Sequence, residues 1–386
     1  MNIREDFKRA NELKFRGDYK EALEIYEKHF RENPQDFKFK DKENYAWILY
    51  RLNVQTFKDE EDFYGSAEFI TKLVPQKDMN VSKNCVYTSA VFSVLNQLND
   101  DDDYFSMISW LDKINPELLD EKPYRKYNRI NKSKKEKFYH YASKAYYKIG
   151  DYETCIEVST HALESLNSFR DDLDIWLKRN IGMSLKGSGR LTESLPYLLE
   201  VIKVKHDWYI YRDIAEVYCM LKKPLDALEY CCPVVLSDVS DYSKINIYYL
   251  IYRILKGFNE KQALKHAQYF YLLKKEKGYR IPEDIENLGI DETRLDKKQL
   301  KREITEIWQE YKFRDIEPSH GTVIKFIEEK NYGFIRPEKG KTLFFHGSEF
   351  ACDTIYVGQK VKFYTQKAFD RSKKRESLNA VYIRAE

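Results

Sequence analysis

Apolar residues in the first three quarters of the chain recur every three to four positions, the spacing of helices that bury one face. The clearest case predicts a helix from Ile3 to about Phe15, a turn at Gly17 and a second helix from Tyr19 to about Arg31, ended by Pro34. Two helices joined by so short a turn pack antiparallel. The chain therefore begins with a helical hairpin.

The same pattern returns along the chain and predicts about seven hairpins in all. The further pairs are expected at 41–53 with 60–73, 81–98 with 103–114, 134–148 with a helix to 166, 172–185 with a helix to 205, 208–221 with 225–236, and 241–256 with 260–274. One hairpin cannot bury its apolar face alone, so consecutive hairpins should stack into a solenoid with a concave surface.

The first hairpin resembles a tetratricopeptide repeat in the spacing of its small, turn and ring residues. The positions that carry the resemblance are Ala10, Gly17, Tyr19, Ala22, Tyr26 and Pro34. Small side chains let the two helices cross closely, and Tyr26 fills the gap to the next pair. The resemblance covers roughly residues 3 to 275 and implies that the concave surface binds a peptide or a protein segment.

The pattern changes after Lys277. Residues 278–292 have the Gly, Pro and acidic content of a loop, 294–313 read as a last helix that caps the solenoid, and 314–319 read as a short linker. We therefore expect helical repeats over 1–277, a loop, capping helix and linker over 278–319, and a separate module over 320–386.

From Gly321 the apolar period becomes two, which indicates strands. Five short segments, GTVIKFI, YGFIRP, TLFFH, QKVKFYTQ and SLNAVYIR, predict a small five-stranded barrel of the OB type. Alternation assigns Ile335, Leu343 and Phe345 to the core of this barrel. The outer face then receives Tyr332, Phe334, Phe344 and His346, with Arg336 beside them, and forms a stacking platform for unpaired bases.

The module resembles the cold-shock domain, whose pattern is G-x-V-K-W-F, then K-G-F-G-F-I, then V-F-V-H. The corresponding residues are GTVIKF at 321–326, KNYGFI at 330–335 and LFFH at 343–346, with GQKV at 358–361 opening the fourth strand. The resemblance implies binding of single-stranded RNA or DNA. The residues expected to carry it are Lys325, Phe326, Tyr332, Phe334, Arg336, Phe344, His346, Arg371, Lys373 and Lys374.

Two stacking surfaces of the family are missing from this chain. Lys325 stands in place of the first-strand tryptophan, and Gly347 in place of the ring after the histidine. We expect a shorter footprint and a weaker affinity, with Lys325 contacting a phosphate instead. The loop 367–375 either adds phosphate contacts or is a solvated hairpin tip.

Charge supports a nucleic-acid-binding module at the C-terminal end. Residues 320–386 hold 13 Lys and Arg against eight Asp and Glu, a net charge of +5, and the other residues hold 53 against 55, a net charge of −2. No apolar signal sequence or membrane-spanning run is evident, so we expect a cytoplasmic protein without membrane contact.

Catalytic and cofactor signals are weak. Asp100–Asp103 lack the spacing of a calcium loop and are expected to form a turn and a helix cap, and KGSGR at 186–190 lacks a preceding strand and the Walker spacing. The six cysteines lack CxxC spacing, and Cys231 and Cys232 are expected to be buried apolar residues. We expect no enzyme, metal or cofactor.

The sequence thus predicts a non-enzymatic adaptor that holds single-stranded RNA in its barrel and a protein partner on its helical repeats. Single-stranded DNA remains open, because stacking tolerates either sugar. The alternative is an effector or nuclease-associated subunit that acts on single-stranded RNA or DNA, for example in mobile-element defence, with a site assembled from distant helices.

Overall fold

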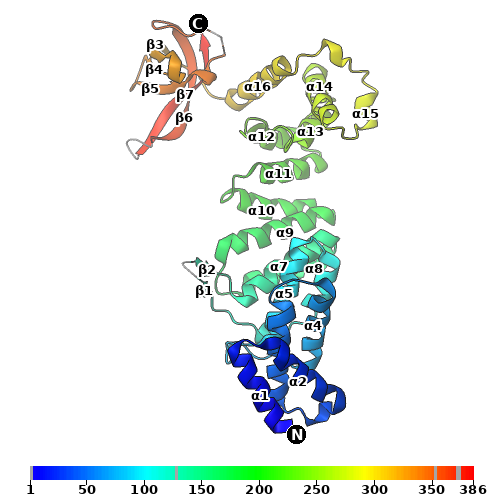
Figure 1. Ribbon diagram of the computed structural model, residues 1–386. Coiled ribbons are helices and arrows are strands. Elements are labelled where there is room, and N and C mark those ends of the chain that lie inside the picture. Colours follow the sequence, from blue (N-terminus) through cyan, green and yellow to red (C-terminus); the bar gives the residue numbers. More distant parts are fainter. Residues whose placement is uncertain (1–2, 127–128, 352–353, 371–374) are drawn as a thin grey trace. The chain divides into compact units, whose positions relative to one another are not determined.

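The computed structural model describes residues 3–126, 129–351, 354–370 and 375–386. The chain divides into two compact units, Met1–Leu221 and Lys222–Glu386. Within the described residues, none of the helices is both long enough and apolar enough to cross a membrane. The helices follow one another in chain order (Figure 1).

The first unit is built of antiparallel helices joined by short turns. Its helices are α1 (Ile3–Arg16), α2 (Tyr19–Glu32), α3 (Phe39–Leu49), α4 (Glu60–Leu73), α5 (Val86–Asp100), α6 (Tyr104–Leu111), α7 (Lys134–Ile149), α8 (Tyr152–Ser165), α9 (Leu173–Gly187), α10 (Leu191–Ile202) and α11 (Trp208–Met220). The sequence missed a small antiparallel hairpin between α6 and α7, formed by β1 (Tyr124–Lys126) and β2 (Arg129–Asn131).

The packing of the first hairpin follows the prediction. Ala10 and Ala22 are fully buried where α1 and α2 cross, and Gly17 turns the chain with a φ of +93°, which favours glycine. The buried Tyr26 ring stacks on Phe7 at 4.9 Å and on Tyr45 of the next hairpin at 5.6 Å. Tyr26 therefore links consecutive repeats.

The second unit starts with helices and ends with the barrel. Its helices are α12 (Pro224–Val235), α13 (Ile245–Leu255), α14 (Glu260–Glu276), the short α15 (Glu283–Glu286) and α16 (Lys297–Phe313). Helix α16 packs on α12 and α14, as expected of a capping helix. Its buried Trp308 donates a hydrogen bond of 2.8 Å to Nε2 of the buried His266 on α14. Burial lowers the pKa of His266 to about 4, so this histidine is a neutral part of the core.

Five strands close into a barrel in the order β3-β4-β5-β7-β6, counted over the described residues. The strands are β3 (Ser319–Ile327), β4 (Tyr332–Pro337), β5 (Leu343–His346), β6 (Lys360–Asp370) and β7 (Arg375–Ala385). All neighbouring pairs are antiparallel except β5 with β7. The predicted five-stranded barrel is confirmed, and Ile335 and Phe345 are fully buried in its core with Leu343 packed against them.

Several residues singled out in the sequence turn out to be structural. Asp103 caps α6 by accepting a hydrogen bond from the Ser106 backbone N–H at 3.0 Å, and the segment 186–190 forms the turn between α9 and α10. Cys231 and Cys232 are buried, as expected. Among the described residues, no group of three or more His, Cys, Asp or Glu side chains is placed to hold a metal ion.

Candidate nucleic-acid interface

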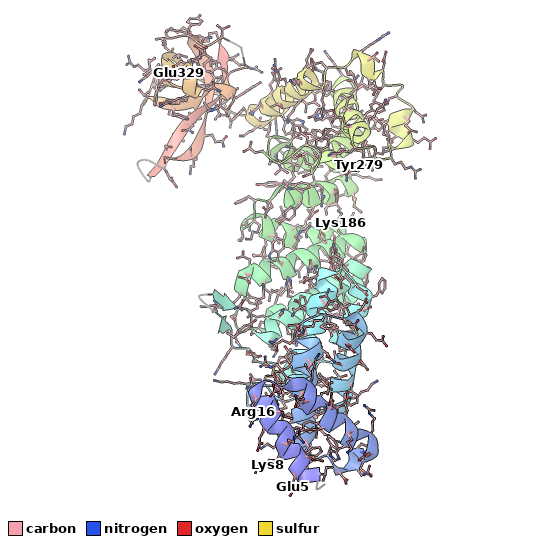
Figure 2. All side chains as sticks on the ribbon, viewed as in Figure 1. Glu5, Lys8, Arg16, Lys186, Tyr279 and Glu329 are labelled. Carbon is pink, nitrogen blue, oxygen red and sulfur yellow. The ribbon has the colours of Figure 1, made fainter. Side chains whose placement is uncertain are left out.

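The outer face of β4 and β5 carries the four predicted rings in two facing pairs. The strand register sets Phe334 opposite Phe344 and Tyr332 opposite His346. Directly opposed residues of an antiparallel pair point to the same face of the sheet. We call Tyr332, Phe334, Phe344 and His346 the aromatic platform. Glu329, labelled in Figure 2, lies in the turn that leads from β3 into this platform.

The platform rings touch each other but are not covered. The ring of Phe344 lies 5.5 Å from Tyr332 and 6.0 Å from Phe334, and the Tyr332 and Phe334 rings are 6.0 Å apart. All three are partly buried, while His346 is exposed. Edge-to-face packing holds the rings in place and leaves ring surface open to solvent. Such a surface suits stacking of unpaired bases.

His346 has a fixed ring orientation at the end of β5. Its Nδ1 lies 2.7 Å from the Ser348 hydroxyl and also accepts from the Ser348 backbone N–H at 3.4 Å. Because Nδ1 acts as an acceptor there, the neutral ring carries its proton on Nε2. Among the described residues that N–H has no acceptor, so it can donate to a base edge or a phosphate.

A β-bulge in β3 decides which residues join the platform. The register with β4 shifts between Val323 and Lys325, so that Val323 faces Ile335 but Lys325 faces Phe334. Lys325 is therefore exposed next to the platform, and Ile327, opposite Tyr332, extends it. Alternation without the bulge gives no reason to include Ile327, and the sequence analysis missed it.

The same bulge turns Phe326 away from the platform. Its ring stacks on the core residue Phe345 at 6.1 Å and packs against the barrel core. The geometry therefore does not support the assignment of Phe326 to the nucleic-acid-binding surface. The extra residue in the bulged strand reverses the alternation after Ile324.

Positive charge surrounds the platform. Arg336 and Lys325 are exposed beside the rings, and Lys339 and Lys341 are exposed in the connection between β4 and β5. Among the described residues, none of these four cations forms an ion pair. They are therefore available for phosphate groups. Arg371, Lys373 and Lys374, which were predicted to contribute, lie outside the described residues.

Gly347, which stands where the family has a ring, packs closely against Asn331. A Cβ built on Gly347 would collide with the side-chain amide of Asn331, and the Gly347 N–H donates to the Asn331 carbonyl at 2.8 Å. Asn331 itself adopts a left-handed conformation with φ of +50°. This local arrangement joins the start of β4 to the end of β5, and a larger residue at 347 would require the Asn331 side chain to move.

Residues 319–382 match the family model described as 'Cold-shock' DNA-binding domain. The barrel is a cold-shock domain. Helical hairpins precede it, so the predicted order of a helical array and a barrel is confirmed. A cold-shock domain indicates nucleic-acid binding, and this family is typically non-enzymatic.

Comparison with solved structures returns helical-repeat proteins. The apo form of RapI shares 13% identity with a TM-score of 0.44, over 81% of this chain and 88% of that one. A tetratricopeptide repeat protein from Parabacteroides merdae shares 15% with a TM-score of 0.33, over 80% and 98%. The human IFIT1 dimer with PPP-AAAA shares 15% with a TM-score of 0.37, over 77% and 60%. Identities and TM-scores this low carry no information about a shared ligand. A search of curated proteins found no match.

Proposed function

We propose that this protein is a non-enzymatic adaptor that holds single-stranded RNA on its cold-shock domain and a protein partner on its helical repeats. The observation that carries the first half is the aromatic platform, where three open rings lie within 6.0 Å of one another. Lys325 and Arg336 flank these rings without carboxylate partners among the described residues. Rings supply stacking energy and cations neutralise the phosphates between the bases.

The proposal names RNA, although the rings would also accept DNA because stacking does not read the sugar. The test is to purify the full chain from cells and to sequence the nucleic acid that copurifies. We expect single-stranded RNA regions, and we expect them to be depleted when Phe334 and Phe344 are replaced by alanine. Copurification of DNA alone would reject the proposal. Equal amounts of RNA copurifying with the wild type and with the alanine variant would also reject it.

The affinity for a short single-stranded RNA is expected to fall with salt. Each phosphate neutralised on a single strand contributes a slope of about −0.7 in log affinity against log salt. If Lys325 and Arg336 each contact one phosphate, the variant Lys325→Gln/Arg336→Gln should show a slope shallower by about 1.4. Fluorescence anisotropy over a range of salt concentrations measures both slopes.

The matched control for that measurement is Lys20→Gln/Lys28→Gln. Both of these lysines are exposed on α2 and, within the described residues, neither forms an ion pair. This control removes the same total charge far along the chain from the barrel and should leave the slope unchanged. Equal slopes for the wild type and the Lys325/Arg336 variant would show that these two cations do not contact phosphate.

A further inference from the structure

One face of α7 carries four lysines that have no carboxylate partner among the described residues. These residues, which we call the α7 lysine face, are Lys134, Lys137, Lys144 and Lys148. Their spacing of three, seven and four residues is that of one helix face. Within the part of the chain that the structure describes, none of the four forms an ion pair, whereas the neighbouring Lys132 bonds to Asp171 and Lys135 to Glu121, both at 3.0 Å.

The four ammonium groups contact uncharged side chains of α5 and α6. Lys137 donates a hydrogen bond to the Asn96 carbonyl oxygen on α5, and Lys144 donates to that of Asn99 at 2.8 Å. Amide oxygens do not cancel a positive charge, so the face keeps its charge.

Aromatic rings hold the remaining ammonium groups. Nζ of Lys134 lies 4.4 Å from the centre of the Phe92 ring, and Lys144 and Lys148 lie 5.1 and 5.9 Å from that of Tyr104. Rings attract cations without neutralising them. The lysine side chains are therefore held in place as a preformed positive site.

Burial, and to a smaller extent repulsion between cations, lower the pKa values of ionisable groups along this face. Burial lowers the pKa of Lys134 to about 8, with Lys137 adding repulsion, and burial also lowers the pKa of Lys137. The pKa of His140, which lies between Lys137 and Lys144 on the helix, falls to about 4 through burial and through repulsion from Lys132, Lys144 and Lys137. The Asp120 carboxylate raises the pKa of Lys134, and the Asp100 carboxylate raises that of Lys137, but neither forms an ion pair with its lysine among the described residues. A bound anion would relieve this repulsion.

The groups at this face are hydrogen-bond donors. The Asn96 oxygen accepts from both Lys137 and the Tyr141 hydroxyl, the latter at 2.7 Å. The Asn96 amide N–H groups then point to no acceptor among the described residues. Ammonium and amide N–H groups together fit a ligand that only accepts, such as carboxylates and the carbonyl oxygens of an extended chain.

The rings of this face argue for a peptide rather than a nucleic acid. Phe92 is 1% exposed and Tyr141 is 6% exposed, and the lysine stems lie over them. Neither Phe92 nor Tyr141 is open to a base, and the partly exposed Tyr104 has Lys144 and Lys148 over its ring. The aromatic platform of the barrel differs in this respect, and stacking there contributes about 1–3 kcal/mol per base. Carboxylates need no ring.

We propose that the α7 lysine face, with Asn96 and Asn99 of α5, binds an acidic segment of the protein partner. This inference rests on the proposed function, in which the helical repeats hold a protein. It adds the chemistry of the partner: consecutive or alternating Asp and Glu side chains on an extended segment, with backbone carbonyls that accept from Asn96.

The test measures a fluorescein-labelled peptide of alternating glutamate and serine on the full chain by anisotropy at low salt. We expect binding that weakens with salt, and no binding of the same peptide with glutamine in place of glutamate. The variant Lys137→Gln/Lys144→Gln should weaken binding at least about tenfold, a loss of about 1.4 kcal/mol. Lys20→Gln/Lys28→Gln, the matched charge control, should bind like the wild type.

The same set of variants separates the two proposals. Lys137→Gln/Lys144→Gln should keep its affinity for single-stranded RNA, and Phe334→Ala/Phe344→Ala should keep its affinity for the acidic peptide. Unchanged helical circular dichroism would show that the lysine variant is folded.

Three outcomes would overturn the inference: no peptide binding by the wild type, equal binding by the lysine variant, or displacement of the peptide by a single-stranded RNA. The last would make the face a nucleic-acid contact instead. Loss of RNA binding in the platform variant, with peptide binding absent throughout, would leave the RNA proposal standing and reject this one.

Discussion

Replacing Phe334 and Phe344 together with alanine is expected to lower the affinity for a short single-stranded RNA by about a hundredfold. Each stacked base contributes about 1–3 kcal/mol by alanine substitution, so two rings together account for about 2–6 kcal/mol, and a hundredfold loss corresponds to about 2.8 kcal/mol. The two rings face each other across β4 and β5, and they are partly buried rather than part of the barrel core. Their removal therefore acts on binding first. Anisotropy with labelled RNA measures the loss, and circular dichroism reports the fold.

Two further variants test whether the loss of affinity comes from the platform rings. Phe334→Leu/Phe344→Leu keeps apolar volume at both positions but removes the ring surface, so it should lose affinity while protecting the fold. Tyr356→Ala removes a ring that is 60% exposed on the same domain but makes no contact with the platform rings, and it should change affinity less than twofold. Wild-type affinity in a folded leucine or alanine variant would show that the platform does not stack bases.

Sequence periodicity predicted much of this site because each β4 and β5 residue keeps strict alternation. The buried Gly333, Ile335 and Phe345 alternate with the outward Phe334 and Phe344, so period two alone separates core from platform. The helical hairpins could also be predicted from the sequence, because turns at Gly17 and Gly150 and the proline at Pro34 mark the ends of helices. The local sequence pattern therefore predicts a structural feature wherever residues close together in the chain determine that feature.

The features that the sequence could not provide depend on register and on distant elements. The bulge between Val323 and Lys325 contains no glycine that would indicate it in the sequence. It nevertheless turns Phe326 toward the barrel core and Ile327 toward the platform. The lysines of the α7 lysine face contact residues such as Asn96 and Phe92, about forty residues earlier in the chain, and a local sequence pattern does not reveal these contacts. Similarly, nothing in the local pattern of β7 shows that Tyr382 adopts a positive φ of +48°.

Four consecutive residues of β7 are buried around that backbone conformation. Ala380 and Ile383 lie in the barrel core, and Val381 and Tyr382 are also buried, although strict alternation would bury only every second residue. The Tyr382 N–H donates to Glu349 at 3.1 Å, which supports the unusual turn of the strand. The Tyr382 side chain thereby leaves the alternating pattern of β7 and joins Phe313, the last residue of α16.

The barrel is consequently attached to α16 by more than the segment 314–319. Phe313 stacks on Tyr364 at 4.3 Å and on Tyr382 at 5.9 Å, with ring planes within 12° of each other. Polar bonds surround this stack. Arg384 donates to Glu310 at 2.7 Å, and Lys312 donates to Gln366 at 3.0 Å. The sequence analysis predicted a short linker at 314–319, and these contacts join α16 to the barrel in addition to that segment.

Phe313→Ala is therefore expected to destabilise the docking of the barrel on α16 by about 3 kcal/mol, the usual cost of removing a buried phenylalanine ring. Phe313 is 4% exposed, and its loss leaves Tyr364 and Tyr382 without their common partner. Hydrogen exchange should accelerate in β6, β7 and residues 314–319, while RNA affinity stays within about twofold because the platform lies on β4 and β5. Phe258→Ala is the matched control, since that ring is 53% exposed in the same unit and should cost less than about 0.5 kcal/mol. If Phe313→Ala exchanges like the wild type, the stack adds no stability, and the barrel behaves as the independent module that the predicted boundary at residue 320 describes.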